Sequence, residues 1–262
     1  TLTTTWTNSS GTVITTGKVT DVGTYTVTVT SSNYSGSKTA TFEVLKRNLN
    51  GATITLNLPT GGYTYDGNAK TPDVTSVTDS EGGAIPAACY TVSWSSNTDA
   101  GTATVTLTAN TSVAEGTASK TFDIAQATIT DFTLESKTLT YNGQAQTLAV
   151  SNVVAGTLTG LTLDTDYTIT WSNNTNAGKD TASVTVTGKG NFTGTITKKF
   201  SINKATIASV TLSATSVVYN GKSQTVPSAT SCVGISKVTA NGVAVTSADY
   251  DVTTTDNTDV GT

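Results

Sequence analysis

Short segments of the chain alternate strictly between apolar and polar residues. In residues 24–30, Tyr25, Val27 and Val29 hold one set of alternating positions, and threonines hold the other. The same alternation returns in segments 90–94, 103–109, 167–171 and 183–187. Because successive side chains of a strand point to opposite faces, each segment predicts a β-strand with one packed face and one face in water. No segment of helical length shows helical periodicity, so the pattern predicts an all-β protein with antiparallel sheets.

Three short sequence markers recur along the chain in a fixed order. The first is Tyr-Asp-Gly or Tyr-Asn-Gly, the second is Asp or Asn followed by x-Gly, and the third is Phe-x-Val or Phe-x-Ile. They begin at Tyr65, Tyr141 and Tyr219, at Asp21, Asp99, Asn176 and Asp259, and at Phe42, Phe122 and Phe200. All three keep a period of about 78 residues, and chance does not give independent markers one period and one order. The chain is therefore predicted to be a tandem repeat.

The period divides the chain into four parts. Residues 1–47 are predicted to be the C-terminal part of a repeat, 48–125 and 126–204 to be whole repeats, and 205–262 to be the N-terminal part of another. On this division the chain starts and stops within a repeat, as expected for a stretch of a longer array. The linkers at 125–128 and 203–206 lack Gly and Pro, which predicts semi-rigid joints.

Dipeptides that favour tight hairpin turns mark the ends of several predicted strands. Asp-Gly and Asn-Gly suit such turns because both residues tolerate a positive φ. They occur at Asp66-Gly67, Asn142-Gly143, Asn220-Gly221 and Asn241-Gly242. Many short strands with frequent turns predict a sandwich or a barrel.

The segment from Asp21 to Val27 resembles the corner before strand F of immunoglobulin domains, Asp-x-Gly-x-Tyr-x-Cys. This resemblance implies that the Tyr25 hydroxyl bonds back to the backbone and locks the corner. Val27 stands where the cysteine would be, and the later copies depart further, with Ala103 in place of the tyrosine and Lys179-Asp180 displacing the pattern. We therefore expect tandem Ig-like antiparallel β-sandwich domains in an extended array, without the immunoglobulin disulfide.

The sequence from Tyr141 to Ile202 carries a longer pattern. It reads Tyr-Asn-Gly-x-x-Gln-Thr, then Asp-Tyr-Thr-Ile-x-Trp-Ser-Asn-Asn-Thr-Asn-Ala-Gly, then Gly-Lys-Gly-Asn-Phe-Thr-Gly-x-Ile-x-Lys-x-Phe-x-Ile. The pattern resembles the tandem Ig-like repeats, of the MBG and YDG types, of large bacterial cell-surface adhesins. The resemblance covers the whole chain in degraded copies. It implies an extracellular stalk between an anchor and a distal binding domain, and related Ig-like modules decorate phage particles.

Composition and charge exclude several classes of partner. The net charge is −4 and the sequence pI is about 4.7, which argues against nucleic acid and anionic membrane surfaces. No segment approaches the ~20 apolar residues of a membrane span. The chain has no His, so neither a Ser–His–Asp nor a Cys–His constellation can form within it. We expect no enzyme activity, no catalytic residue and no cofactor.

Four kinds of residue are candidates for chemistry, each with a structural alternative. Cys89 and Cys232 occupy different positions in different repeats, so unpaired buried thiols are expected, with pairing between chains as the alternative. Three acidic pairs could offer oxygens to Ca²⁺, but the repeats do not share them, and solvated turns are the default expectation. These pairs are Asp79 with Glu81, Asp164 with Asp166, and Asp256 with Asp259. No metal site is predicted.

The other two kinds of candidate are lysines and tryptophans. Lys38, Lys120 and Lys198 precede the marker Phe by two or four residues, which places each lysine on the same strand face as that Phe. Some Ig-like modules carry Lys–Asn isopeptide bonds, but no acidic partner recurs, so we expect lysines that extend to solvent. Exposed tryptophans could bind glycans. Trp6, Trp94 and Trp171 alternate with apolar residues, however, which predicts packing in the core.

Two functions suit this organisation. The first is a structural stalk or spacer in a large bacterial cell-surface or secreted adhesin, with the neighbouring repeats as partners and other homotypic or host-surface contacts made elsewhere. The alternative is a phage fibre or decoration module, or an extracellular filament subunit, in which the repeats make assembly contacts by pairing of edge strands. A weaker third option is direct binding of glycans or host proteins.

Overall fold

The chain forms an all-β structure, as its alternating pattern predicted. The computed structural model describes residues 1–212, 218, 221–222, 235–240 and 243–245. Besides strands, these residues form one short 3₁₀ turn, η1 (Ala87–Cys89), and no helix among them is long and apolar enough to cross a membrane. The chain divides into two compact units, Thr1–Ala127 and Thr128–Thr262.

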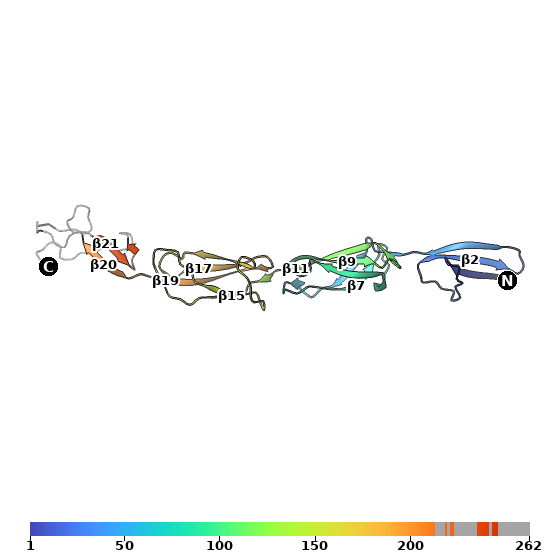
Figure 1. Cartoon of the computed structure of the whole chain (residues 1–262), viewed down its shortest axis with the longest axis horizontal. Coiled ribbons are helices and arrows are strands. Elements are labelled where there is room, and N and C mark those ends of the chain that lie inside the picture. Colours follow the sequence, from blue (N-terminus) through green and yellow to red (C-terminus); the bar gives the residue numbers. More distant parts are fainter. Residues whose placement is uncertain (213–217, 219–220, 223–234, 241–242, 246–262) are drawn as a thin grey trace. The chain divides into compact units, whose positions relative to one another are not determined.

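The first unit begins with a single three-stranded antiparallel sheet, called here the first sheet. Its strands lie in the order β1-β2-β3 (Figure 1). They are β1 (Leu2–Asn8), β2 (Gly23–Ser31) and β3 (Ser37–Val44). The predicted strand at 24–30 thus lies within the central strand β2.

The rest of the first unit is called the second repeat. Its strands are β4 (Arg47–Asn48), β5 (Thr53–Asn57), β6 (Tyr63–Thr64), β7 (Asp73–Thr78), β8 (Tyr90–Ser95), β9 (Gly101–Ala109), β10 (Ala114–Glu115) and β11 (Thr117–Ala125). Four of them form a sheet in the order β6-β11-β9-β8, where β6 runs parallel to β11 and the other pairs are antiparallel. β5 pairs with β7 in a separate hairpin, and β4 pairs with β10 in parallel.

Two layers of strands share the core of the second repeat. Ile54 and Val77 come from the β5–β7 hairpin, whereas Val105, Leu107 and Phe122 come from the four-stranded sheet, and all five are buried in one cluster. Burial of apolar side chains from both layers is the main force that holds such a pair of sheets together.

The second unit repeats this arrangement in what is called the third repeat. Its strands are β12 (Ala127–Thr128), β13 (Asp131–Leu134), β14 (Leu139–Thr140), β15 (Val150–Val154), β16 (Tyr167–Ser172), β17 (Gly178–Gly188), β18 (Phe192–Thr193) and β19 (Thr195–Asn203). The four-stranded sheet has the order β14-β19-β17-β16, with β14 parallel to β19, and β13 pairs with β15. After it, β20 (Ile207–Leu212), β21 (Ile235–Ala240) and β22 (Val243–Val245) form an antiparallel sheet.

The first sheet and the two four-stranded sheets keep the same cross-strand register at their sequence markers. A tryptophan lies opposite the same central valine each time: Trp6 opposite Val27, Trp94 opposite Val105, and Trp171 opposite Val184. The marker phenylalanines also keep their partners, since Phe42 faces Tyr25, Phe122 faces Ala103 and Phe200 faces Ala182. The sequence markers therefore occupy equivalent places in the three sheets.

The connections between successive parts are short. β3 ends at Val44 and β4 begins at Arg47, so two residues join the first sheet to the second repeat. β11 ends at Ala125 and β12 begins at Ala127, which leaves Gln126 between them. Arg47 pairs with Ala114 of β10 and so lies in a strand of the second repeat.

Candidate functional site

The first sequence marker forms a turn between two sheets rather than a hairpin. Gly67 and Gly143 have φ values of 81° and 76°, whereas the residues before them do not have positive φ. Instead, the Asp66 carboxylate accepts a hydrogen bond from the Asn68 amide at 2.8 Å, and the Asn142 side chain accepts one from Gln144 at 2.9 Å.

The hairpin prediction is wrong at both of these turns. The turn at Asp66 leads from β6 of one sheet to β7 of the other. In this turn the Asp or Asn side chain replaces the backbone contact that a hairpin turn would have. Asn220 lies outside the described residues, and so do Asn241 and Gly242. The strands that flank this last pair do form a hairpin, with Ala240 opposite Val243.

The marker turn is held to a loop that follows the tryptophan strand. In the second repeat the Lys70 amide donates to the Asn97 carbonyl at 2.7 Å, and the Asn97 side-chain amide donates back to the Lys70 carbonyl at 2.8 Å. In the third repeat Gln146 and Asn174 exchange the same two bonds, each at 2.8 Å. We call this reciprocal pair of bonds the turn clamp.

The turn clamp of the second repeat contains a buried charge. Lys70 is 7% exposed, and its ammonium group forms an ion pair with Asp66, whose side chain is about half exposed. Hydrogen bonds from Lys70 and from the Asn68 amide lower the pKa of the Asp66 carboxyl below its ordinary value. In the third repeat the neutral pair Asn142 and Gln146 takes these places, so the position has a structural role that does not require a charge.

Sequence reasoning missed the turn clamp. A signal was present, since Asn97 and Asn174 both stand three residues after the repeat tryptophan. The residue before each of them, Ser96 or Asn173, has a positive φ of 52° or 53°. This shared strained backbone position turns the asparagine back towards the marker turn.

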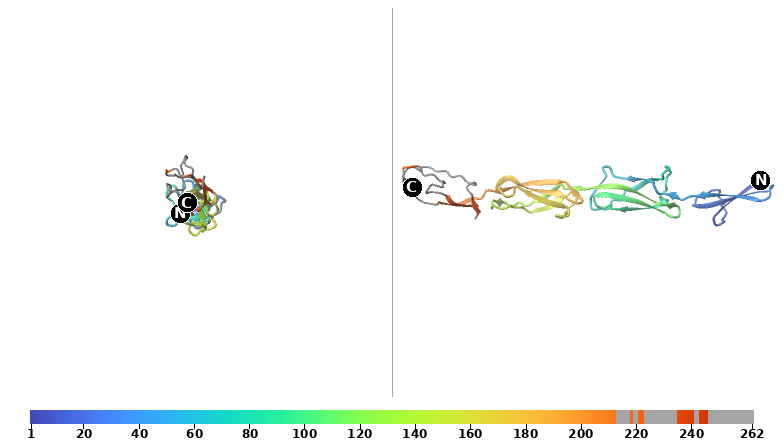
Figure 2. Two further views of the ribbon diagram at one scale, coloured as in Figure 1. Left: turned by 90° about the vertical axis from the view of Figure 1, so that its left-hand side faces the viewer. Right: turned by 90° about the horizontal axis from the view of Figure 1, so that it is seen from above.

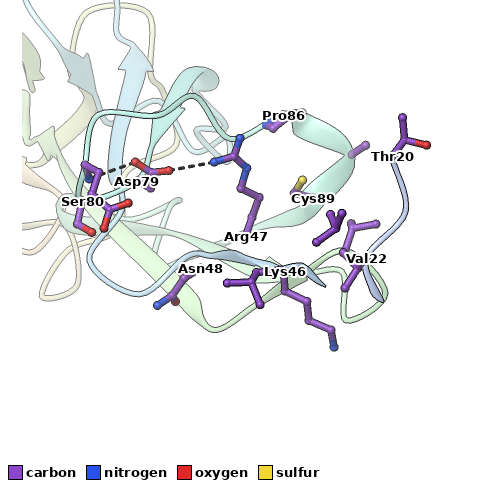
Figure 3. A pocket seen from close by; sticks show the side chains of 14 residues that line it. Thr20, Val22, Lys46, Arg47, Asn48, Asp79, Ser80, Pro86 and Cys89 are labelled. Atoms are coloured by element: carbon purple, nitrogen blue, oxygen red, sulfur yellow. Dashed lines mark hydrogen bonds and ion pairs between the residues drawn. The ribbon is translucent and has the colours of Figure 1, made fainter. Parts of the chain in front are cut away.

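A hollow of about 700 Å³ lies beside the β4 strand (Figure 3). Residues of segments 20–22, 44–48 and 79–89, with Val113, line it. The Arg47 guanidinium points to the Asp79 carboxylate and lies 3.2 Å from it, whereas the Lys46 side chain points away (Figure 3). The Asp79 carboxylate also accepts hydrogen bonds from the amides of Glu81 and Gly83, at 3.1 and 2.6 Å. The Asp79 carboxylate in the hollow is therefore bound both by Arg47 and by its own loop.

The acidic pairs serve local turns where the structure describes them. Asp79 binds its own loop and Arg47, and the Asp166 carboxylate accepts a hydrogen bond from the Thr162 amide at 2.8 Å. Burial, together with the charges of Asp164 and Asp166, raises the pKa of Tyr167. Asp256 and Asp259 lie outside the described residues. Among the described residues no three Asp, Glu, Cys or His side chains lie close enough together to hold a metal ion.

The three candidate lysines have different surroundings. Lys38 and Lys120 are exposed, as expected. Lys198 instead reaches across to β13, where its ammonium group lies 2.8 Å from the Asp131 carboxylate and 4.8 Å from the centre of the Phe132 ring. It also donates to the Phe132 carbonyl, and the contact with Lys198 lowers the pKa of Asp131. Both charged side chains of this pair keep contact with solvent.

The predicted packing of the tryptophans holds in part. Trp171 packs edge-on against Phe200, with ring centres 5.7 Å apart, in the core of the third repeat. The prediction is wrong for Trp94, whose side chain in β8 is 36% exposed. Trp6 is partly buried, with its ring 6.5 Å from that of Phe42.

Two smaller expectations concern Cys89 and the corner. Cys89 is a free, buried thiol, as expected, and Cys232 lies outside the described residues. The Tyr25 hydroxyl donates to the Asp21 carbonyl at 2.8 Å, which confirms the tyrosine corner inferred from the segment Asp21–Val27.

Comparison with known proteins gives one family match. Residues 130–206 match the MBG domain family. The third repeat is therefore similar to MBG domains. This match supports the MBG part of the resemblance for that part of the chain, and the Asn142 turn, the Gln146–Asn174 clamp and the Lys198–Asp131 pair lie within the matched residues.

Similarity beyond the MBG domain is distant. No curated protein sequence matches the chain. Among solved structures, the chain is similar to surface layer protein SbsC, domains 1–6, at 16% sequence identity and a TM-score of 0.22. The similarity covers 81% of this chain and 36% of that chain, so this chain spans about a third of the length of that structure.

Proposed function

We propose that the chain is a spacer segment of a bacterial cell-surface or secreted protein, built from repeated MBG-type domains and without enzyme activity. The observation that carries this proposal is that a buried Val and a buried Phe of the sheet repeat at equivalent positions, while several exposed residues differ. Val105 and Val184 are both fully buried, and the marker residues Phe122 and Phe200 are only 4% and 7% exposed. At the surface, by contrast, Thr53 stands where the third repeat has Asp131, and Asp66 stands where it has Asn142.

This contrast favours a structural role over a shared binding site. A site repeated for function would keep its exposed side chains, whereas a fold repeated for length keeps its core. The short connections, such as the single residue Gln126 between β11 and β12, support a joint with little freedom. The MBG domain at 130–206 and the acidic, threonine-rich composition support an extracellular location.

Small-angle X-ray scattering tests the spacer role directly. A compact protein of this length has a radius of gyration of about 18 Å. Repeats of about 30 Å each, joined end to end, give about 30 Å or more. The matched control replaces Gln126 with a five-residue Gly-Ser linker, and we expect it to broaden the distance distribution. A value near 18 Å for the native chain refutes the proposal.

An assembly role, as in a fibre or filament subunit, is the second candidate. The edge strands β8 and β16 favour it, because an edge strand can pair with a strand of another molecule. Sedimentation over a wide range of protein concentration separates the two roles. A spacer stays monomeric, whereas an assembly module forms oligomers as concentration rises.

A further inference from the structure

The Asn142 turn of the third repeat places an asparagine directly before a glycine. It connects β14 of the four-stranded sheet to β15, which pairs with β13, in the part of the chain drawn in yellow and orange (Figure 2). Asparagine is among the thermally labile residues of proteins, because the backbone nitrogen of the next residue can attack its side-chain amide. A side chain on that next residue hinders the attack, whereas glycine has no Cβ to do so. Asn142 is exposed, so water and base reach it.

The fold holds the Asn142 side chain along the backbone that has to react with it. Its Oδ1 accepts a hydrogen bond from the Gln144 amide at 2.9 Å, so the carboxamide lies beside the peptide of the intervening Gly143. When a nitrogen attacks Cγ, negative charge develops on Oδ1. The Gln144 N–H is already in place to stabilise that charge. The turn therefore supplies both a reachable nitrogen and a donor for the oxygen.

Other asparagines meet only one of these two conditions. Asn110 accepts the same kind of local bond, from the Ser112 amide at 3.3 Å, but a threonine follows it. Asn50 precedes a glycine, but its Oδ1 accepts a hydrogen bond from the Thr117 amide, at 3.2 Å, which holds its side chain against a distant segment. Of the residues that the structure describes, only Asn142 combines the local turn with a following glycine.

We propose that Asn142 is a site of self-modification, at which the chain converts this asparagine to aspartate and isoaspartate without an enzyme. The Gly143 nitrogen gives up its proton to base in the solvent and forms a bond to Cγ of Asn142. The bond from Cγ to Nδ2 then breaks, and the nitrogen takes up a proton and leaves as ammonia. The product is a cyclic imide. This inference does not depend on the spacer role.

Water completes the reaction by adding to one of the two imide carbonyls. Cleavage of the bond between Cγ and the Gly143 nitrogen gives aspartate. Cleavage of the bond between the main-chain carbonyl carbon and that nitrogen gives isoaspartate, in which the main chain runs through the former side chain. Nothing is oxidised or reduced, so water and base are the only co-reactants.

The two products should act differently on the third repeat. Aspartate keeps the oxygen that accepts from the Gln144 amide, and Asp66 shows that the same turn accepts a carboxylate. Isoaspartate instead lengthens the main chain inside a turn that is tied on both sides. The Tyr141 amide donates to the Asn203 carbonyl at 2.9 Å on one side, and the turn clamp holds Gln146 on the other. A longer main chain no longer fits between these ties, so isoaspartate should open the turn clamp.

Peptide mapping by mass spectrometry tests the proposal on the full chain. The protein is kept at mildly alkaline pH and sampled over time, and electron-based fragmentation separates aspartate from isoaspartate. We expect Asn142 to lose its amide at least about tenfold faster than Asn110, which lacks the glycine, and than Asn50, which lacks the local turn. These two asparagines are controls within the same molecule.

Two variants extend the test. The double variant Asp66→Asn, Lys70→Gln gives the second repeat the same asparagine-glycine turn, and residue 66 should then react at a rate close to that of Asn142. Asn142→Asp supplies one product directly, and we expect it to melt like fresh protein. Aged native protein should instead gain a fraction that melts at lower temperature, in proportion to its isoaspartate content.

Three outcomes overturn the proposal. The first is loss of the amide at Asn142 no faster than at Asn110. The second is an equal rate at Asn50, since the turn would then have no part in the reaction. The third is faster loss at Asn142 when the chain is unfolded in denaturant, because that result would show that the turn protects this asparagine.

Discussion

At the scale of single residues, no buried side-chain nitrogen or oxygen in the part of the chain that the structure describes lacks a hydrogen-bond partner. Lys70 has a buried, charged side chain. Its backbone amide and carbonyl bond to Asn97, and its ammonium group pairs with Asp66. The third repeat fills the same site with Gln146, whose side-chain amide donates to the Thr140 carbonyl at 3.1 Å. The chain therefore contains two solutions to one packing problem, one charged and one neutral.

The two solutions can be exchanged by mutation. Asp66→Ala should destabilise the second repeat, because it leaves the buried Lys70 ammonium without its acceptor. The double variant Asp66→Asn, Lys70→Gln copies the third repeat and should lose less stability than Asp66→Ala. Denaturant unfolding of the three proteins measures both differences. An Asp66→Ala variant as stable as the native chain would show that water replaces the carboxylate.

Stability should fall at acid pH through the two ion pairs. The pKa values of Asp66 and Asp131 are lowered in the folded chain from an ordinary value of 3.8. A lowered pKa contributes stability that is present above the unfolded-state value and is lost as pH falls through the folded value. The melting temperature should therefore change little from pH 7 to about 5 and drop below about pH 4. In Asp131→Asn the loss of stability at acid pH should become smaller for the third repeat alone. An unchanged fall of the melting temperature at acid pH would contradict the contribution of Asp131.

At the scale of strands, alternation and register determine which faces pack. The predicted strands at 90–94, 103–109, 167–171 and 183–187 lie within β8, β9, β16 and β17. Period-2 alternation predicts strands well because a half-buried sheet needs one apolar face. It does not give strand order or what covers each face, so it could not distinguish Trp94, which is 36% exposed, from Trp171, which packs against Phe200, although both lie in edge strands.

The marker phenylalanines should differ in energetic importance according to their cover. Phe122→Ala should cost about 3–5 kcal/mol, because it opens a cavity in a closed core. Phe42→Ala in the native chain should cost about 1 kcal/mol or less, since that side chain already meets solvent. Chemical denaturation monitored by circular dichroism compares them. Equal losses would mean that the first sheet is covered in solution.

Turns were harder to predict than strands. Asp66-Gly67 and Asn142-Gly143 have hairpin composition, yet both connect different sheets through a side chain that bonds two residues ahead. The turn clamp was missed for a related reason, since its bonds join residues far apart in the sequence. Local composition cannot distinguish a hairpin from a sheet-to-sheet turn, because tertiary contacts decide between them.

At the scale of the whole chain, the repeats have separate cores. The buried cluster around Phe122 belongs to the second repeat, and the cluster around Phe200 belongs to the third. The sequence period predicted the order of these parts from their markers. It could not show that β5 and β7 form a separate layer from the four-stranded sheet, because strand pairing depends on tertiary contacts and not on the spacing of markers.

Separate cores should unfold independently. Phe122→Ala and Phe200→Ala should each lower a different transition in differential scanning calorimetry, and their effects should add in the double variant within about 0.5 kcal/mol. The two single variants serve as controls for each other. A single transition shifted by both substitutions would show that the second and third repeats unfold together.

Parallel pairing at the ends of each complete repeat has a mechanical consequence. In the second repeat, β4 enters parallel to β10, and β6 runs parallel to the last residues of β11. In the third repeat, β14 runs parallel to the last residues of β19. Tension on the two ends of a repeat pulls such strands past each other lengthwise, so their hydrogen bonds carry load together instead of opening one at a time. We therefore expect each of these two repeats to resist stretching along the direction in which the chain runs.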